Sequence, residues 1–197
     1  EEGVAVEVIP TDQPFVWHAN RPWVPPSPNL PDLKNVRLYA ATALIEALDV
    51  SEGRGTPLPF RWIGAPNLDP LALANAFNTQ MADLYAVWQQ PVWLTARPAF
   101  LTPSTSKHAG QRCAGVQLHE GGEHLGEGSL AVGLVLFALL EQAGAVRHAD
   151  WLQKLLGVPS SEVPSSAPEM LAALAEWQQR GQEQAKRLSQ FWLYARE

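Results

Sequence analysis

A short segment near the middle of the N-terminal half combines carboxylates, hydroxyls and an arginine. Gly53 and Gly55 flank Arg54, and a glycine has no side chain to keep a ligand away from the backbone. The planar guanidinium of an arginine matches the geometry of a carboxylate. The pattern therefore favours a binding site for an acidic group, with a plain turn carrying an exposed arginine as the alternative that the residues alone leave open. The candidate side chains of this segment are Glu46, Asp49, Ser51, Glu52, Arg54 and Thr56.

A second pattern, Ser104-x-x-Lys107, matches the motif in which a lysine activates a serine nucleophile in penicillin-recognising enzymes. That chemistry needs the serine at the start of a long buried helix, together with S-D-N and K-T-G motifs further along the chain. Gly110 follows quickly and neither motif occurs. A polar loop is the better interpretation, and a serine peptidoglycan enzyme is the third hypothesis for function.

Histidine, cysteine and glutamate also gather in one stretch, which raises the question of a metal site. Their spacing is irregular, and the stretch contains neither H-E-x-x-H nor a C-x-x-C pair. We therefore expect no bound metal and no cofactor, with Cys113 acting as a small buried apolar residue. The stretch contains His108, Cys113, His119, Glu120, Glu123 and His124.

Composition limits the kinds of partner. Of 197 residues, 46% are hydrophobic and 17% are charged, which predicts one sizeable folded domain and excludes a disordered or fibrous chain. The formal charge is −6 and the basic residues are scattered, so we expect no binding to nucleic acid. The longest apolar run, residues 130–140, is shorter than the roughly 20 residues that span a bilayer, so we expect no membrane insertion. The single Cys113 leaves the compartment open.

The elements that must position these residues follow from periodicity and from Pro and Gly. In the N-terminal part, the pattern predicts a short strand at 4–9, an extended proline-rich arm at 10–31, a helix at 38–48 and a strand at 58–63. Asp69 followed by Pro70 is a well-formed helix start, because the aspartate can cap free N–H groups and proline needs no donor at the first position.

The remaining sequence predicts two strands and a set of helices. The strands are expected at 92–101 and 113–119, and a helix buried on all sides at 130–143. A short helix is expected from Asp150 to Gly157, and Ser166 with Glu169 indicates a further helix start, with Gly181 separating it from a last helix. The fold class is therefore α/β or α+β, with a mixed sheet flanked by helices.

Several motifs occur in one order along nearly the whole chain. They are residues 23–31, Glu46 with 51–57, Pro59-Phe60, 63–66, Ser106-Lys107, Gly110, Cys113, Gly115-Val116, Leu118-His119, Trp177, Arg187 and 191–194. Together they resemble the NamZ-type exo-β-N-acetylmuramidase family, long catalogued as a domain of unknown function. The chain departs from the usual family pattern at Tyr39-Ala-Ala-Thr42 and at Glu46-Ala-Leu-Asp49.

The resemblance implies a bacterial glycoside hydrolase with two domains, of which this chain resembles the C-terminal one. On that basis residues 1–35 are expected to form an arm between domains and 36–197 a cleft-forming domain, with a Rossmann-like catalytic domain upstream that this chain lacks. The implied ligand is a muramyl sugar or peptidoglycan fragment, and a secreted or periplasmic location is favoured over the cytoplasm. The resemblance carries over, as cleft residues, Asn29, Glu46, Ser51, Arg54, Thr56, Lys107 and His119, with Glu46 the one candidate for a catalytic role.

The chemistry of muramic acid sharpens these expectations. Its lactyl group is a carboxylate, for which Arg54 is the first candidate partner and Lys107 the second. Trp23 and Trp62 are candidates for an apolar platform under the sugar, although a tryptophan more often lies in the core. Hydrolysis usually needs paired carboxyl groups. Because the resemblance places the usual catalytic glutamate in the upstream domain, this chain alone is expected to give no turnover. The alternative function is a non-catalytic module that binds cell-wall sugars.

Overall fold

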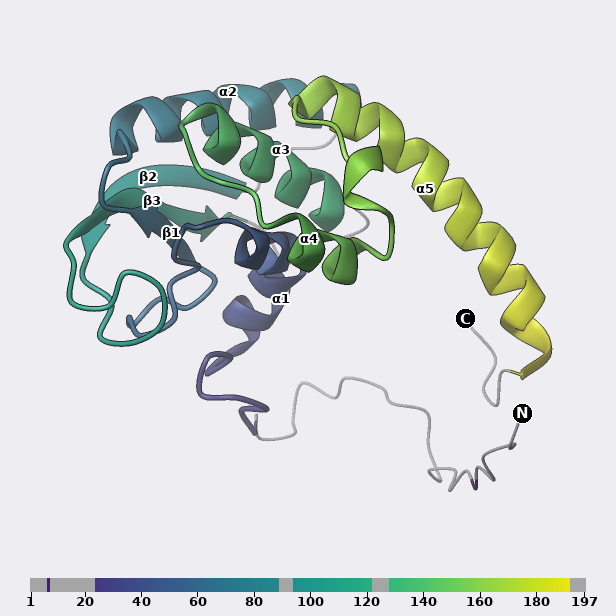
Figure 1. Cartoon of the computed structure of the whole chain (residues 1–197), viewed down its shortest axis with the longest axis horizontal. Helices are drawn as coiled ribbons and strands as arrows, with labels where there is room; N and C mark the ends of the chain where they lie inside the picture. The colour runs from purple at the N-terminus through teal and green to yellow at the C-terminus, as the bar shows by residue number, and fades with distance from the viewer. Residues whose placement is uncertain (1–6, 8–23, 89–93, 122–127, 192–197) are drawn as a thin grey trace.

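The computed structural model describes residue 7 and residues 24–88, 94–121 and 128–191 (Figure 1). The expected strand at 4–9, apart from residue 7, and the arm up to residue 23, including Trp23, lie outside the described residues. The helices are α1 (Leu33–Thr42), α2 (Pro70–Trp88), α3 (Ser129–Gln142), α4 (Ala149–Leu156) and α5 (Ala167–Leu188), and the strands are β1 (Trp62–Ala65), β2 (Leu94–Leu101) and β3 (Cys113–Glu120). Three short 3-10 helices are η1 (Ala43–Ala47), η2 (Ser160–Glu162) and η3 (Ser189–Phe191).

The first helix differs from its prediction at both ends. It begins at Leu33, before the expected start, because the side chain of Asp32 caps it by accepting a hydrogen bond of 2.9 Å from the Asn35 N–H. It gives way to η1 after Thr42, whose Oγ1 lies 2.8 Å from the Leu38 carbonyl and 3.2 Å from the Phe60 carbonyl. A threonine that bonds back to a carbonyl of its own helix weakens the regular pattern, so the helix ends there.

The strands form a three-stranded sheet in the order β1-β3-β2. Both pairs are antiparallel, so the described strands do not form the mixed sheet that was expected. Helix α2 carries the chain from β1 to β2, which leaves these two strands pointing the same way, but β3 lies between them and separates the parallel pair. The expected class, helices packed on a sheet, is confirmed.

The individual strands follow the predictions to different degrees. Strand β3 matches its expected range, and β2 continues through Pro98, which an edge strand tolerates because its N–H side can face away from the ladder. Strand β1 starts later than predicted. Residues 58–61 form a turn instead, in which the N–H groups of Arg61 and Trp62 both bond to the Leu58 carbonyl.

Helix α3 lies at the centre of the molecule and packs against α1, α2 and α5, while the sheet packs against α2 (Figure 1). Nine of its 14 residues are buried, as the apolar run predicted. At Gly133 the helix comes so close to α1 that an added Cβ would lie 2.1 Å from the Ala41 carbonyl oxygen. Among the described residues, no helix is both long and apolar enough to cross a membrane.

Helix α5 runs through Gly181 without a break, so the prediction of two helices there is wrong. Only the first half of α5 is buried against the body, through Ala167, Met170 and Leu174, and the second half extends away from it (Figure 1). A glycine lowers helix stability without ending a helix whose other residues favour it. The helix start at Ser166 is as predicted, with Ser166 Oγ donating to a carboxylate oxygen of Glu169 at 2.7 Å.

Gly181→Ala is expected to raise the free energy of unfolding by about 0.5–1 kcal/mol, because alanine loses less backbone entropy in a helix. No atom of the described residues outside the adjoining helix backbone lies within 4 Å of the Cβ that the substitution adds at Gly181. Urea unfolding followed by circular dichroism measures the change. The matched variant is Gly133→Ala, also within a helix, which should lower stability by about 1–3 kcal/mol through overpacking. Equal effects of the two substitutions would contradict the described course of α5.

Candidate functional site

The segment that precedes β1 is held in a tight double turn. Ser51 pairs with Gly64 of β1 through two backbone hydrogen bonds of 2.9 and 3.0 Å, and Ser51 Oγ accepts the Gly53 N–H at 3.2 Å. Thr56 Oγ1 donates to the Gly53 carbonyl at 2.7 Å and accepts the Leu58 N–H at 3.1 Å. Gly53 has φ +84°, and an added Cβ would lie 2.5 Å from the Leu58 carbonyl oxygen. The hydroxyls of Ser51 and Thr56 thus shape the backbone that presents Arg54.

Phe60 closes the same turn in a conformation that only a few non-glycine residues adopt. Its φ is 60°, and its side chain is buried. Helix α1 holds it there, because Thr42 Oγ1 lies 3.2 Å from the Phe60 carbonyl and Asn35 Nδ2 donates to the Pro59 carbonyl at 2.5 Å. The guanidinium of Arg54 stacks over the Phe60 ring, 4.8 Å from its centroid. Phe60, held in this strained backbone conformation, therefore supports the Arg54 guanidinium through the face of its ring.

The loop between β2 and β3 brings Lys107 to this segment. Both the N–H and the Oγ of Ser104 donate to the Gly55 carbonyl, at 2.8 and 2.9 Å. The residues on either side of the lysine, Ser106 and His108, have φ values of 68° and 57°. Two positive φ values at non-glycine residues within three positions are costly, and such backbone strain gathers at functional sites. The loop thereby turns the Lys107 side chain inward.

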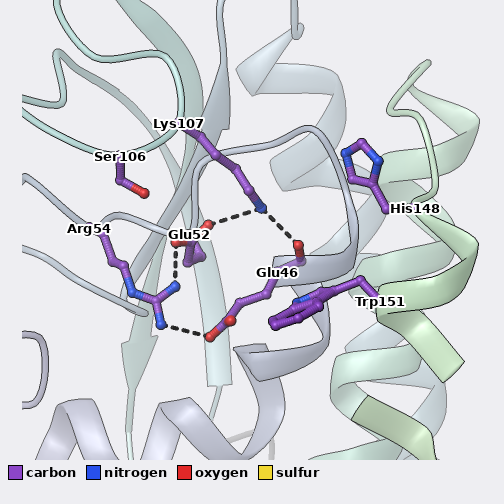
Figure 2. A pocket seen from close by; sticks show the side chains of 7 residues that line it. All are labelled: Glu46, Glu52, Arg54, Ser106, Lys107, His148 and Trp151. Carbon is purple, nitrogen blue, oxygen red and sulfur yellow. Dashed lines mark hydrogen bonds and ion pairs between the residues drawn. The ribbon is translucent and has the colours of Figure 1, made fainter. Parts of the chain in front are cut away.

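Two carboxylates and two cations meet where the loop contacts the segment (Figure 2). Arg54 donates through Nη1 to Glu52 Oε1 at 2.5 Å and through Nη2 to Glu46 Oε1 at 2.8 Å. Lys107 Nζ donates to the carbonyls of Glu46 and Leu48, at 2.9 and 2.7 Å, and lies 3.3 Å from Glu52 Oε2. We call Glu46, Glu52, Arg54 and Lys107 the charged quartet.

Glu52 is the buried member of the quartet. Its side chain is 2% exposed, against 30% for both Arg54 and Lys107. Within the described residues, Glu52 Oε2 accepts no hydrogen bond, since Lys107 lies at ion-pair distance but outside hydrogen-bond geometry. Burial by itself lowers the pKa of Arg54, but the hydrogen bonds to Glu52 and Glu46 outweigh it and raise the pKa above its usual value. Arg54 therefore stays charged, and the quartet as a whole has no net charge when both glutamates are ionised.

The quartet lines an open pocket of about 240 Å³. Helix α4 supplies the opposite wall through His148, its N-cap residue, and Trp151 (Figure 2). The His148 N–H is fixed by a 2.8 Å hydrogen bond to the Ala47 carbonyl, whereas the Trp151 side chain is 43% exposed. The pocket is thus polar on one side and aromatic on the other. Its lining residues are Glu46, Glu52, Arg54, Ser106, Lys107, His148 and Trp151.

The structure brings together three of the seven predicted site residues at this pocket, Glu46, Arg54 and Lys107. Ser51 and Thr56 lie in the turn behind it. Asn29 lies before α1, where its N–H bonds to Ser27 Oγ at 3.2 Å. His119 lies on β3 and accepts a 2.8 Å hydrogen bond from Arg97 Nε. Burial and then the nearby Arg97 lower the pKa of His119, which favours its neutral form.

Two pocket residues were missed by sequence reasoning. As isolated residues, His148 and Trp151 gave no signal in the sequence. The buried residue of α4 is Leu152, so the side chain of Trp151, the residue before it, must point in another direction. Trp62 is not a sugar platform but lies in the core, the alternative that the sequence favoured. Its ring is fully buried and its Nε1 donates to the Ala99 carbonyl at 3.2 Å.

The two other patterns do not assemble into reactive sites in the described part of the chain. Ser104 bonds to the Gly55 carbonyl and Lys107 to the carbonyls of Glu46 and Leu48, so the lysine is not aimed at the serine hydroxyl. No three metal-ligating side chains converge among the described residues, outside which Glu123 and His124 fall. Burial raises the pKa of the Cys113 thiol, which disfavours the thiolate that a metal binds.

Comparisons with known proteins identify the family of this chain and solved structures that share its fold. Residues 37–194 match the family model described as exo-β-N-acetylmuramidase NamZ, C-terminal. The peptidoglycan β-N-acetylmuramidase NamZ of Bacillus subtilis (strain 168) is 42% identical over 98 residues, which cover 50% of this chain and 22% of that protein.

Two solved structures of DUF1343 family proteins from Bacteroides fragilis NCTC 9343 share the fold. They superpose with TM-scores of 0.63 and 0.55 at 20% and 22% identity, each covering 88% of this chain. The matched region is 45% and 44% of those chains. This chain therefore spans less than half the length of the proteins it matches.

Proposed function

The chain belongs to the NamZ family of exo-β-N-acetylmuramidases, whose C-terminal domain it matches, and we propose that its pocket holds the terminal N-acetylmuramic acid of a peptidoglycan fragment. The observation that carries the proposal is the meeting of the charged quartet and Trp151 around one open pocket. A volume of about 240 Å³ suits a single sugar ring, since sites for drug-sized ligands begin at about 300 Å³.

Arg54 is the group that we propose for the lactyl carboxylate. Lys107 already donates two of its three ammonium hydrogens to carbonyls, and its charge is paired with Glu52 at 3.3 Å. Arg54 has five N–H groups, is 30% exposed and lines the pocket, so it can present further N–H groups to a ligand. The sugar carboxylate would thus share the guanidinium with Glu46 and Glu52.

Arg54→Ala is expected to lower the preference for N-acetylmuramic acid over N-acetylglucosamine at least about tenfold, the loss of one charge-assisted hydrogen bond. Isothermal titration calorimetry with both sugars measures it. The ratio of the two affinities within one variant cancels any general loss of folded protein. Arg180→Ala, which removes an exposed arginine of α5, is the control. If Arg54→Ala leaves the ratio of the two sugar affinities unchanged, another group binds the lactyl carboxylate.

For the reaction itself, we propose that this chain supplies the binding part. Glycoside hydrolysis needs one carboxyl group to protonate the leaving oxygen and a second to attack or to activate water. Glu46 is the candidate within this chain, with 15% of its side chain exposed to the pocket. The other carboxyl group would come from a part of the intact protein outside the region matched here, such as the proposed upstream catalytic domain.

A non-catalytic module for peptidoglycan sugars is the second candidate. The observation that favours it is that both carboxylates lining the pocket, Glu46 and Glu52, already contact a cation. A chromogenic N-acetylmuramide distinguishes the two candidates. Turnover by the natural full-length protein, with none by this chain, supports the enzyme, and binding without any turnover supports the module.

A further inference from the structure

Trp151 is the exposed aromatic residue of the pocket wall. Its side chain is 43% exposed, although the same helix buries Leu152 completely. The helix holds it firmly, because α4 is fixed at its N-terminus by the His148–Ala47 hydrogen bond and ends at Gly157 in the left-handed region. The position of the indole at the pocket is thus set by the anchoring of α4, and a large part of the indole surface stays exposed.

The surroundings of Trp151 indicate what the exposed indole contacts. In Figure 2 the indole lies beside Glu46, and the other three members of the charged quartet lie beyond Glu46. A ligand that fits must offer an apolar face to the indole and hydrogen-bonding groups at its rim. A pyranose ring with equatorial substituents has both, since its C–H groups form a face and its hydroxyl and acetamido groups lie around the edge.

Glu52 gives a second observation that points to such a ligand. Its Oε2 is an acceptor on a buried side chain that lines the pocket and takes no hydrogen bond from the described residues. Buried carboxylate oxygens are ordinarily satisfied, so this one, which is closed off from solvent beside Lys107, is suited to accept a hydrogen bond from a ligand once the Lys107 ammonium shifts. A sugar hydroxyl or amide N–H is such a donor.

We propose that Trp151 forms a stacking subsite for the ring of one N-acetylated amino sugar, with the hydrogen-bonding rim of that sugar facing the charged quartet. The subsite rests on the proposed function and deepens it, because it assigns the ring and the lactyl group to different residues. Trp151 contacts the sugar ring that N-acetylmuramic acid and N-acetylglucosamine share. Arg54 binds the lactyl carboxylate that only N-acetylmuramic acid carries.

The test is calorimetric titration of both sugars into the wild-type chain and three variants. Trp151→Ala is expected to weaken both sugars by the same factor, at least about tenfold, leaving their ratio unchanged. Trp151→Phe should restore part of the affinity. The matched control is Phe100→Ala, because Phe100 is 52% exposed but does not line the pocket. The two aromatic rings also have similar neighbours. The Arg112 guanidinium lies 4.8 Å from the Phe100 ring centroid, and the Lys154 ammonium lies 5.5 Å from the Trp151 ring centroid.

Fluorescence provides the second readout. The ligand-induced change in indole emission of the wild type should be absent in Trp151→Phe at a saturating sugar concentration. If Trp151→Ala binds both sugars as tightly as the wild type and Trp151→Phe keeps the full emission change, the stacking subsite is wrong while the proposed function stands. If the wild-type chain binds neither sugar, the proposed function is wrong and the subsite with it.

Discussion

Glu52→Ala is expected to lower the free energy of unfolding by about 3 kcal/mol, the low end of the range for breaking a buried ion pair, and to abolish binding of N-acetylmuramic acid. Glu52 is 2% exposed and faces both cations of the quartet, so its removal leaves Arg54 and Lys107 without their shared partner. The low end applies because both cations are 30% exposed and keep some contact with water.

Urea unfolding and calorimetric titration of the sugar measure the two effects. Glu52→Gln preserves the shape of the side chain and removes its charge, so it should recover only part of the stability. Glu46→Ala is the matched control, because Glu46 is 15% exposed and contacts only one of the two cations through its carboxylate. It should cost clearly less than Glu52→Ala. A loss below about 1 kcal/mol for Glu52→Ala, as at an exposed ion pair, would show that Glu52 does not organise the quartet.

Arg147→Ala is expected to lower the free energy of unfolding by about 3–5 kcal/mol, because it leaves Glu141 and two carbonyls without their donor. Arg147 donates through Nε and Nη2 to the two carboxylate oxygens of Glu141, at 2.7 and 2.6 Å. It also donates to the carbonyls of Val163 and Pro164, at 2.8 and 2.9 Å. One guanidinium thus joins the end of α3, the start of α4 and the segment before α5.

Urea unfolding measures this loss, and Arg147→Lys separates charge from geometry. A lysine keeps the charge but cannot make the same fork of hydrogen bonds, so most of the loss should remain. Arg180→Ala removes an arginine whose two ion-pair contacts are exposed, and it should change stability by less than about 0.5 kcal/mol. Similar losses in Arg147→Ala and Arg180→Ala would contradict the role of Arg147.

Arg147 also links stability to the site. It lies directly before His148 and Trp151 in the chain, and its backbone pairs with Leu48 next to the quartet. A loosened α4 would move the aromatic wall away from the charged wall. We therefore expect Arg147→Ala to weaken sugar binding even though Arg147 does not line the pocket.

Local pattern was enough for much of the secondary structure. The start of α2 at Asp69-Pro70, strand β3, the buried helix α3 and the end of α4 at Gly157 all match their predictions. In each case the signal, a cap, an alternation or an apolar run, acts within a few residues of chain. The break at Gly181 was wrong because a single glycine costs less than the surrounding helical residues provide.

By itself, the sequence determined the family motifs and the class of fold, and it named four side chains that line the pocket, Glu46, Glu52, Arg54 and Lys107. Only the tertiary structure decided that Glu52 lies buried between the two cations, that Trp62 is in the core and that Trp151 lines the pocket. The physical reason is that burial and the pairing of charges depend on segments distant in the sequence. Residues 46–54, the loop carrying Lys107 and helix α4 meet only when the sheet and α3 hold them together.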